Sequence, residues 1–312
     1  MLPVSLSLAW SALSIQRALA VEPQRVGSVD HQLVDEQSGI VQSRRWPDTY
    51  WVHNDSGDEA RLFAIDATGA VIVPPFLEQR YHTGPARRRT KRGDPPPWPG
   101  LTVEGASHVD WEDLATDGEH LFIGDMGNNG NARRDLGVYV LREPNPRAVS
   151  SARVLSFIPV AYPSQSSFPA KQWHFDCEAL FTHSGRLYFV TKHRATGQIT
   201  APEPSADLYR LDSWETDHVN VLAHVDHHAD LGGWVTAADL SPDGERLAVL
   251  VGAPTPGLWL FDTPEVGDAF LSSTSEHLPL GDVGQAEGVT WASGDRILVT
   301  NEQRAIFELL LE

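Results

Sequence analysis

The sequence predicts an all-β fold, a five-bladed β-propeller whose four-stranded antiparallel blades are closed by the N-terminal strand. Two observations lead to this prediction. A short apolar strand with a small or acidic residue, then a turn, then a second apolar strand with a polar end, recurs five times along the chain. The 22 prolines and 25 glycines would interrupt long helices, and no window shows the apolar period of a helix.

Each unit begins with two strands joined by a turn. The first strands are predicted at Glu36–Ile40, Trp111–Ala115, Cys177–Phe181, Ala237–Ser241 and Ala286–Thr290. The second strands, rich in β-branched and aromatic residues, are predicted at Tyr50–Asp55, Leu121–Asp125, Leu187–Lys192, Leu247–Val251 and Ile297–Glu302. Turns such as Thr-Asp-Gly and Pro-Asp-Gly lie between them, which indicates β-hairpins.

Third and fourth strands complete the units. Third strands are predicted at Ala60–Ile65, Gly137–Leu141, Asp207–Leu211, Gly257–Phe261 and Ala305–Leu309. Weaker fourth strands are predicted at Ala70–Pro74, Arg153–Val160, Val219–Val225 and Glu276–Leu280. The last unit has no fourth strand, and Gln24–Val29 precedes the first unit without belonging to it. We expect Gln24–Val29 to fill the vacant place, because closure of the ring removes open sheet edges.

The first 20 residues have features of a signal peptide. Val4–Leu13 is apolar, and Ala18-Leu19-Ala20 has the small-x-small form of a cleavage site. We therefore predict a signal peptide over residues 1–20, a single β-propeller domain over residues 21–312, and a periplasmic or secreted protein. Because no basic residue precedes the apolar stretch and Arg17 follows it, a cytoplasmic location stays open as the alternative.

Composition limits the partners. The formal net charge of −18 argues against nucleic acid and anionic membranes, which both require a basic surface. No stretch of 18 apolar residues predicts a membrane span. The lone Cys177 excludes an internal disulfide. We expect a monomer that binds a small molecule and, given its charge, a cation.

One long insertion, residues 75–105, separates the first two units. It contains the basic run Arg87–Arg92 and the proline-rich run Pro95–Pro99. Such a composition is typical of an exposed loop with polyproline character. An alternative is that the basic run docks on an acidic partner, including the protein's own surface.

The first strands of a propeller line its central channel. Stacking the five units gives one column of Ser38, Glu112, Glu178, Ala238 and Glu287, and beside it a column of Gly39, Asp113, Ala179, Asp239 and Gly288. Because strand residues alternate between faces, one column must point towards the axis. The second strands add Asn54, Asp55, Asp125, Lys192, Asn301 and Glu302 at their ends.

Carboxylates that converge on one axis repel each other, so their pKa values rise or a cation must lie between them. Calcium is the predicted cofactor, because Ca²⁺ prefers carboxylate and amide oxygens. The predicted metal ligands are Glu112, Glu178, Glu287, Asn54, Asp125 and Asn301. Lys192 offers an alternative, since its ammonium group could replace the metal or bind a substrate anion. A further alternative is that the acidic residues only cap turns by accepting backbone N–H bonds.

Other chemistries have little support. The sequence has no Gly-x-Ser-x-Gly elbow, no glycine-rich phosphate loop and no His-Glu-x-x-His motif. His224, His227 and His228 surround Asp226 on an outer strand and its loop, where we expect solvent-facing histidines. Cys177 adjoins Glu178, an acidic setting that disfavours a thiolate, so we expect it to pack in the core.

The repeated signature resembles the SdiA-regulated proteins and the related esterase-like, phytase-like propellers. In the first group the five units lead with Ser, Glu, Glu, Ser and Glu, and this chain has Ser38, Glu112, Glu178, Ala238 and Glu287. The most specific match is Ala286–Thr290 followed by Thr300–Glu302. The resemblance covers residues 24–312 apart from the insertion, and it implies an exported bacterial propeller without an agreed activity.

An axial cation held by Glu, Asn and Asp is more distantly similar to the gluconolactonase and paraoxonase class. That similarity implies a calcium-dependent hydrolase of small phosphoesters or lactones, with Asp239 or Glu302 as base. We expect Lys192 and Ser38 to contact the substrate. Those enzymes have six blades and another ligand order, so the roles transfer by analogy only. The alternative function is a non-catalytic propeller that binds a ligand or protein and holds a structural cation.

Overall fold

The structure is a computed structural model that describes residues 22–85 and 93–311. In these residues the regular structure is β-strand apart from two short 3-10 turns, η1 (Pro75–Leu77) and η2 (Phe270–Ser272). This confirms the predicted all-β class. The predicted signal peptide and the basic run Arg87–Arg92 lie outside the described residues. A search of the described part for a helix long and apolar enough to cross a membrane finds none.

The strands form four sheets. Two of them have four strands, in the orders β20 (Ala286–Ser293), β21 (Arg296–Asn301), β22 (Ala305–Leu310), β1 (Gln24–Ser28), and β16 (Trp234–Leu240), β17 (Arg246–Ala253), β18 (Gly257–Asp262), β19 (Ser275–Pro279). The third has the order β10 (Trp173–His183), β11 (Arg186–Arg194), β13 (Ala206–Leu211), β15 (Ala223–His228), with β12 (Pro202–Glu203) added to β11.

The fourth sheet has nine strands. Its order is β2 (Gln37–Gln42), β3 (Tyr50–Asn54), β4 (Arg61–Ile65), β5 (Leu101–Glu104), β9 (Ser151–Ala161), β8 (Gly137–Arg142), β7 (His120–Asp125), β6 (Trp111–Thr116), with β14 (Asn220–Val221) on β9. The pairs β5–β9 and β14–β9 are parallel. The sheet therefore joins two predicted units, and strand pairing gives four sheets where the sequence predicts five separate blades.

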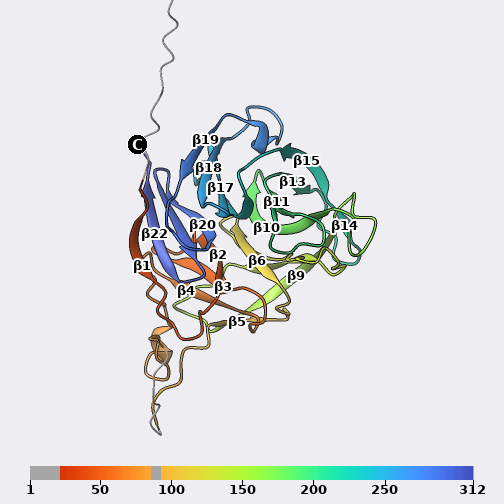
Figure 1. Cartoon of the computed structure of the whole chain (residues 1–312). Helices are drawn as coiled ribbons and strands as arrows, with labels where there is room; N and C mark the ends of the chain where they lie inside the picture. Colours follow the sequence, from red (N-terminus) through yellow and green to blue (C-terminus); the bar gives the residue numbers. More distant parts are fainter. Residues whose placement is uncertain (1–21, 86–92, 312) are drawn as a thin grey trace, which may run out of the picture.

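The innermost strands form a closed ring. Strand β2 contacts β6, β6 contacts β10, β10 contacts β16, β16 contacts β20, and β20 returns to β2. Figure 1 shows β2, β6, β10 and β20 around the centre, with β1, β15 and β19 at the periphery. This radial arrangement of sheets is that of a β-propeller, and it brings together side chains that are far apart in the sequence.

The described part of the insertion, residues 75–85 and 93–105, is packed more closely on the sheet than its composition predicts. The fourth strand expected at Ala70–Pro74 is reduced to a bridge between Ile65 and Val71, and β5 takes its place beside β4. Trp98, in the proline-rich run expected to be exposed, is 3% exposed and packs edge-on against Tyr81 at 5.3 Å. Burial of this large ring keeps the end of the insertion on the sheet.

The predicted closure by the N-terminal strand is confirmed. Strand β1 pairs antiparallel with β22, with a bulge between Arg25 and Gly27. At the bulge the backbone approaches another segment closely, because a Cβ atom added to Gly27 would lie 2.1 Å from the carbonyl oxygen of Thr68. Glycine is therefore required there.

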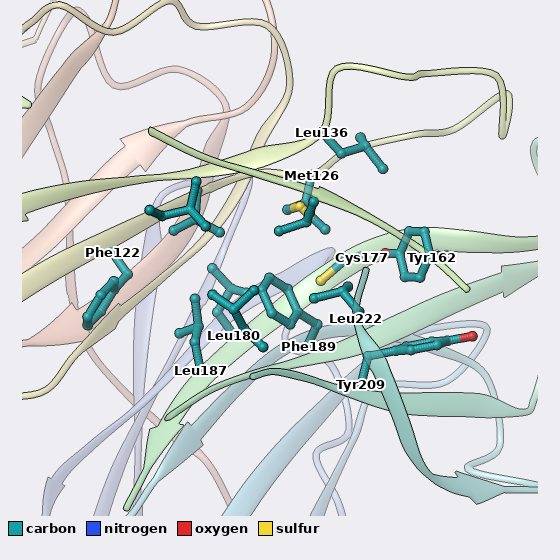
Figure 2. Close-up of a cluster of buried hydrophobic side chains, with 14 of the residues drawn as sticks. Phe122, Met126, Leu136, Tyr162, Cys177, Leu180, Leu187, Phe189, Tyr209 and Leu222 are labelled. Carbon is teal, nitrogen blue, oxygen red and sulfur yellow. The ribbon is translucent and has the colours of Figure 1, made fainter. Parts of the chain in front are cut away.

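Apolar side chains fill the space between neighbouring sheets. Figure 2 shows one such cluster, in which Phe122 and Met126 meet Leu180, Phe189 and other residues of the next sheet. Cys177 is part of this cluster and 1% exposed, and burial raises the pKa of its thiol well above the usual range. The predicted packing role of Cys177 is thus confirmed.

We expect Gly27→Val to lower the free energy of unfolding by about 2 kcal/mol, because the new side chain would push β1 off the Thr68 carbonyl. The measurement is urea unfolding followed by tryptophan fluorescence. Gly130→Ala is the control, since nothing lies within 4 Å of a Cβ atom there. Equal midpoints for the two variants would show that closure by β1 does not matter for stability.

Candidate functional site at the hub

Each of the innermost strands has a β-bulge near its start. The register with the second strand shifts at Ser38 in β2, Glu112 in β6, Glu178 in β10, Thr236 in β16 and Glu287 in β20. A bulge re-aims the side chain that it carries. In the predicted column of Ser38, Glu112, Glu178, Ala238 and Glu287, the assignment of Ala238 is therefore wrong. Pairing of Val235 with Val251 and of Ala237 with Leu250 places Thr236, not Ala238, at the equivalent position.

The two hydroxyl residues of this column tie neighbouring inner strands together. Ser38 Oγ donates to the carbonyl of Glu112 at 2.8 Å, and Thr236 Oγ1 donates to the carbonyl of Ala286 at 2.9 Å. Both bonds are buried and cross from one innermost strand to the next. Ser38, predicted to contact substrate, thus has a structural partner, although it also lies on the wall of the central cavity.

A cavity of about 70 Å³ lies among the bulged residues. Its wall contains the polar residues Gln37, Ser38 and Asn129 and the charged residues Asp55, Glu112, Glu178, Lys192, Glu287 and Glu302. The predicted convergence of Glu112, Glu178 and Glu287 is therefore seen. The volume suits a metal ion with a few waters, or a small polar group.

Two cations offset part of the negative charge. Lys192 Nζ lies 2.9 Å from Glu178 Oε1, and the side chains are 11% and 5% exposed. Arg194 pairs with the buried Asp176 and lies 3.7 Å from the same Glu178 oxygen. Burial alone would raise the pKa of Glu178, but Lys192 and Arg194 lower it overall. Glu178 is therefore an ionised partner of Lys192.

Glu112, Glu287 and Glu302 form no ion pair with a cation of the described residues, although the charge of Lys192 partly offsets the effect of burial on Glu287 and Glu302. Burial and then the neighbouring Glu178 raise the pKa of Glu112 well above its usual range. Burial raises the pKa of Glu287 to about 8, and it also raises the pKa of Glu302. The hub, by which we mean the central cavity and the residues of its wall, therefore holds more acid groups than its own cations can keep ionised.

Three carboxyl groups converge on one side of this cavity. Asp55, Asp110 and Glu112 each offer an oxygen, and these oxygens lie within 4.8 Å of one another. Asp110 is absent from the predicted site, although it directly precedes Trp111 at the start of β6. Gly127 leaves room for the group, since a Cβ atom there would lie 2.0 Å from Glu112 Oε1 and 2.4 Å from Asp110 Cγ.

Gln37 is an orphaned polar residue on the same wall. Its side chain is fully buried, with 0% exposure. Neither Oε1 nor Nε2 has a hydrogen-bond partner among the described residues. A buried amide without partners costs about 1–3 kcal/mol for each unpaired group. A guest in the cavity that accepts from the amide nitrogen and donates to, or is coordinated by, the oxygen would remove that cost.

Three predicted metal ligands lie elsewhere. Asn54 Nδ2 donates to Leu33 O at 2.7 Å, and Asn301 Nδ2 donates to Val283 O at 2.7 Å. Asp125 accepts from Arg133 at 2.8 Å. Asn54 and Asn301 each precede a residue of the cavity wall, Asp55 and Glu302, so strand alternation points them away from the cavity, to the loops before the first strands. Asp125 also accepts from the backbone N–H of Asp110, just before β6, at 3.2 Å.

The aspartates of the second column hold the ring together. Asp113 accepts backbone N–H bonds from Leu180 at 2.9 Å and Ala238 at 3.4 Å, which joins β6 to β10 and β16. Asp239, a predicted base, accepts from the backbone N–H of Trp291 at 2.9 Å. The structure does not bring Asp239 to the wall of the cavity, whereas Glu302, the other predicted base, lies on it.

Comparison with known proteins adds little. No family model and no curated protein sequence matches the chain. Among solved structures, a PQQ-bound aldose sugar dehydrogenase from Streptomyces coelicolor is 12% identical, with a TM-score of 0.44 over 93% of this chain and 98% of that one. A gluconolactonase from Xanthomonas campestris is 13% identical, with a TM-score of 0.42 over 93% and 95%.

A chain of a mitotic checkpoint complex gives nearly the same score, with 12% identity and a TM-score of 0.43 over 100% and 99% of the two chains. Proteins of unrelated function thus match equally well, so these similarities support no argument about activity. The resemblance to the SdiA-regulated and phytase-like propellers stays a prediction.

We expect Lys192→Met to destabilise the protein by about 3–5 kcal/mol, because it leaves the buried Glu178 carboxylate without its partner. Adding Glu178→Gln should recover part of the loss. Chemical unfolding at neutral pH measures both effects. Arg142→Met, which breaks an ion pair of 65% and 62% exposed side chains, should cost less than about 1 kcal/mol. A Lys192→Met variant as stable as the control would contradict this account of the hub.

Proposed function

We propose that the chain forms a five-bladed propeller in which each innermost strand begins one blade. The nine-stranded sheet supports this division, because among the described strands its two antiparallel series, β2 to β5 and β6 to β9, are hydrogen-bonded to each other only through their outer strands, β5 and β9. The bulges support it as well, since one occurs in each of the five innermost strands. The hub is then a site with fivefold pseudo-symmetry and unlike residues.

We infer that the hub binds a divalent cation of the calcium type and uses it to hold a small substrate. Gln37 is the observation that carries this inference, because its buried amide has no hydrogen-bond partner among the described residues and the residue belongs to the wall of a cavity that also holds surplus carboxyl groups. Asp55, Asp110 and Glu112 would hold the cation through oxygen atoms, and Gln37 Oε1 could add another. Hard oxygen ligands of this kind suit Ca²⁺.

Hydrolysis of an ester-type bond, in a phosphoester or a lactone, fits the remaining residues. A bound cation would act as a Lewis acid on the substrate oxygen. Glu302 would accept a proton from the attacking water. The water oxygen would form a bond to the phosphorus or the carbonyl carbon of the substrate, and the bond from that atom to the leaving oxygen would break. Glu287 would return a proton to that leaving oxygen. Asp55 and Asp110 are partly exposed, so the cation would be reachable from solvent, as catalysis requires.

We expect the purified protein to bind one Ca²⁺ per chain in isothermal titration calorimetry and to unfold at a lower temperature after chelation. Asp110→Asn should weaken binding at least tenfold, because it removes one of three carboxylates. Asp217→Asn is the matched control, since it alters an exposed acidic cluster with Glu215 and His218. Absence of Ca²⁺ binding, or equal affinity in the two variants, would reject the cation site.

Turnover of p-nitrophenyl phosphate and of a simple δ-lactone, each with and without Ca²⁺, then tests the hydrolase. A protein that binds Ca²⁺ at Asp110 and turns over neither probe would support the non-catalytic alternative, a ligand-binding propeller with a structural cation. Cation-dependent turnover lost in Glu302→Gln would support the enzyme.

We expect Gln37→Leu to raise the free energy of unfolding by about 1 kcal/mol in the presence of a chelator, because the variant has no buried unpaired amide. The same variant should bind Ca²⁺ or substrate more weakly. Gln42→Leu, on the same strand, is the control: its amide donates to Ala292 O at 3.1 Å, so the substitution should lower stability. If both variants lose stability equally, Gln37 has a partner within the protein and the inference from it is wrong.

A further inference from the structure

A second cluster of ionisable groups lies on the sheet formed by β10, β11, β13 and β15. His224 and His227 of β15 are exposed, as the sequence predicts, but they do not surround Asp226. His224 Nε2 lies 3.0 Å and His227 Nδ1 lies 2.9 Å from the same oxygen, Oδ1 of Asp207 in β13. Asp226 instead accepts from Ser272.

Two more histidines reach Asp207 from the other side. His193 of β11 is 1% exposed, and its Nε2 lies 3.4 Å from Asp207 Oδ2. His174 of β10 stacks on His193, with ring centroids 3.8 Å apart and planes 3° from parallel. The proposed function at the hub uses none of these groups.

We propose that His174, His193 and Asp207 form a binding site for a first-row divalent transition metal such as Zn²⁺. Each of the three offers one ligand atom, and these atoms lie within 4.8 Å of one another. Two imidazoles and one carboxylate match the donor set of zinc sites that keep a fourth position for water. The cation ligands proposed at the hub, Asp55, Asp110 and Glu112, bind through oxygen atoms. The two sites would therefore select different metals.

A metal on His193 Nε2 would replace the contact of this atom with Thr191 Oγ1 at 2.8 Å, whereas the contacts of the other ring atoms are those expected around metal ligands. His193 Nδ1 lies 2.9 Å from Ser205 Oγ, and His174 Nε2 lies 2.7 Å from Glu203 Oε2. Asp207 Oδ1 is held by the two outer histidines, which leaves Oδ2 towards His193. Outer partners of this kind fix the orientation of ligands and tune their affinity.

One movement is required for chelation. The lone pairs of stacked parallel rings lie in parallel planes, so both rings cannot bind one ion as they stand. Zinc bonds of about 2.0–2.2 Å also need the ligand atoms to approach to roughly 3.3 Å. His174, whose side chain is 23% exposed, can turn towards Asp207, whereas the buried His193 is fixed. The unliganded stack is then a resting arrangement that the metal opens.

The test is Zn²⁺ titration of the full chain against a chromophoric chelator, with Ca²⁺ present to fill the hub. We expect one Zn²⁺ per chain, an affinity at least tenfold lower in His174→Ala, and no binding in Asp207→Asn. His218→Ala is the matched control, because His218 belongs to another group of possible ligands, with Glu215 and Asp217.

The Co²⁺ form of the wild type gives a second readout that needs no variant, since two nitrogen ligands and low coordination number give intense visible bands. Weak octahedral bands, or zinc affinity that falls in His218→Ala and not in His174→Ala, would overturn the proposal. Zinc binding that persists in Asp110→Asn would separate this site from the hub, whereas its loss there would overturn the assignment to Asp207.

Discussion

A bulge at the same place in every innermost strand decides what lies at the centre of this molecule. The extra residue interrupts the alternation of side chains along the strand and directs its own side chain towards the centre of the ring of strands. Ring closure then forces Glu112, Glu178 and Glu287 to share a cavity of about 70 Å³. Hydroxyl residues occupy the other two bulges, where they bind the carbonyl groups of the next strand. Two of the five bulged residues thus link neighbouring strands, and the other three place carboxyl groups on the cavity wall.

The charge is only partly balanced. Lys192 and Arg194 keep Glu178 ionised, and Arg194 offsets part of the rise that burial causes in the pKa of Asp176. Among the described residues, Glu112, Glu287 and Glu302 form no ion pair of this kind, although the charge of Lys192 lowers the pKa of Glu287 in part. Their raised pKa values mean that ionising these carboxyl groups in the cavity costs free energy. Either protonation or a bound divalent cation lowers that cost. Gln37 supports the proposed cation. Protonation of the acids leaves its amide unpaired, whereas a hydrated cation that reaches the amide would supply partners to both of its ends.

The sequence contains the repeat and therefore most of the fold, including the pairing of the N-terminal strand. It does not contain the registers. The sequence predicts Asn54, Asp125 and Asn301 as ligands, but successive residues of a strand face opposite sides, and without the register the sequence does not show which side faces the cavity. Gln37 lies within a predicted first strand but has no counterpart of its type in the other units, so the repeat does not mark it. Asp110 has acidic counterparts in Glu36 and Asp176, but it precedes the predicted first strand Trp111–Ala115. The link between β5 and β9 depends on a long insertion that has no counterpart elsewhere in the chain.

The two candidate sites share a wall. Lys192 and His193 are neighbours on β11, so alternation sends one side chain to the hub and the other towards Asp207. Trp234 supports both, because its indole nitrogen donates to His193 O at 2.9 Å and its ring lies 5.1 Å from Lys192 Nζ. Because the Trp234 indole contacts both residues, it holds the β11 backbone at Lys192 and His193 in place between the two sites. Turning of His174 would therefore occur at the start of β10, where its side chain is 23% exposed, while the hub side of β11 keeps its geometry.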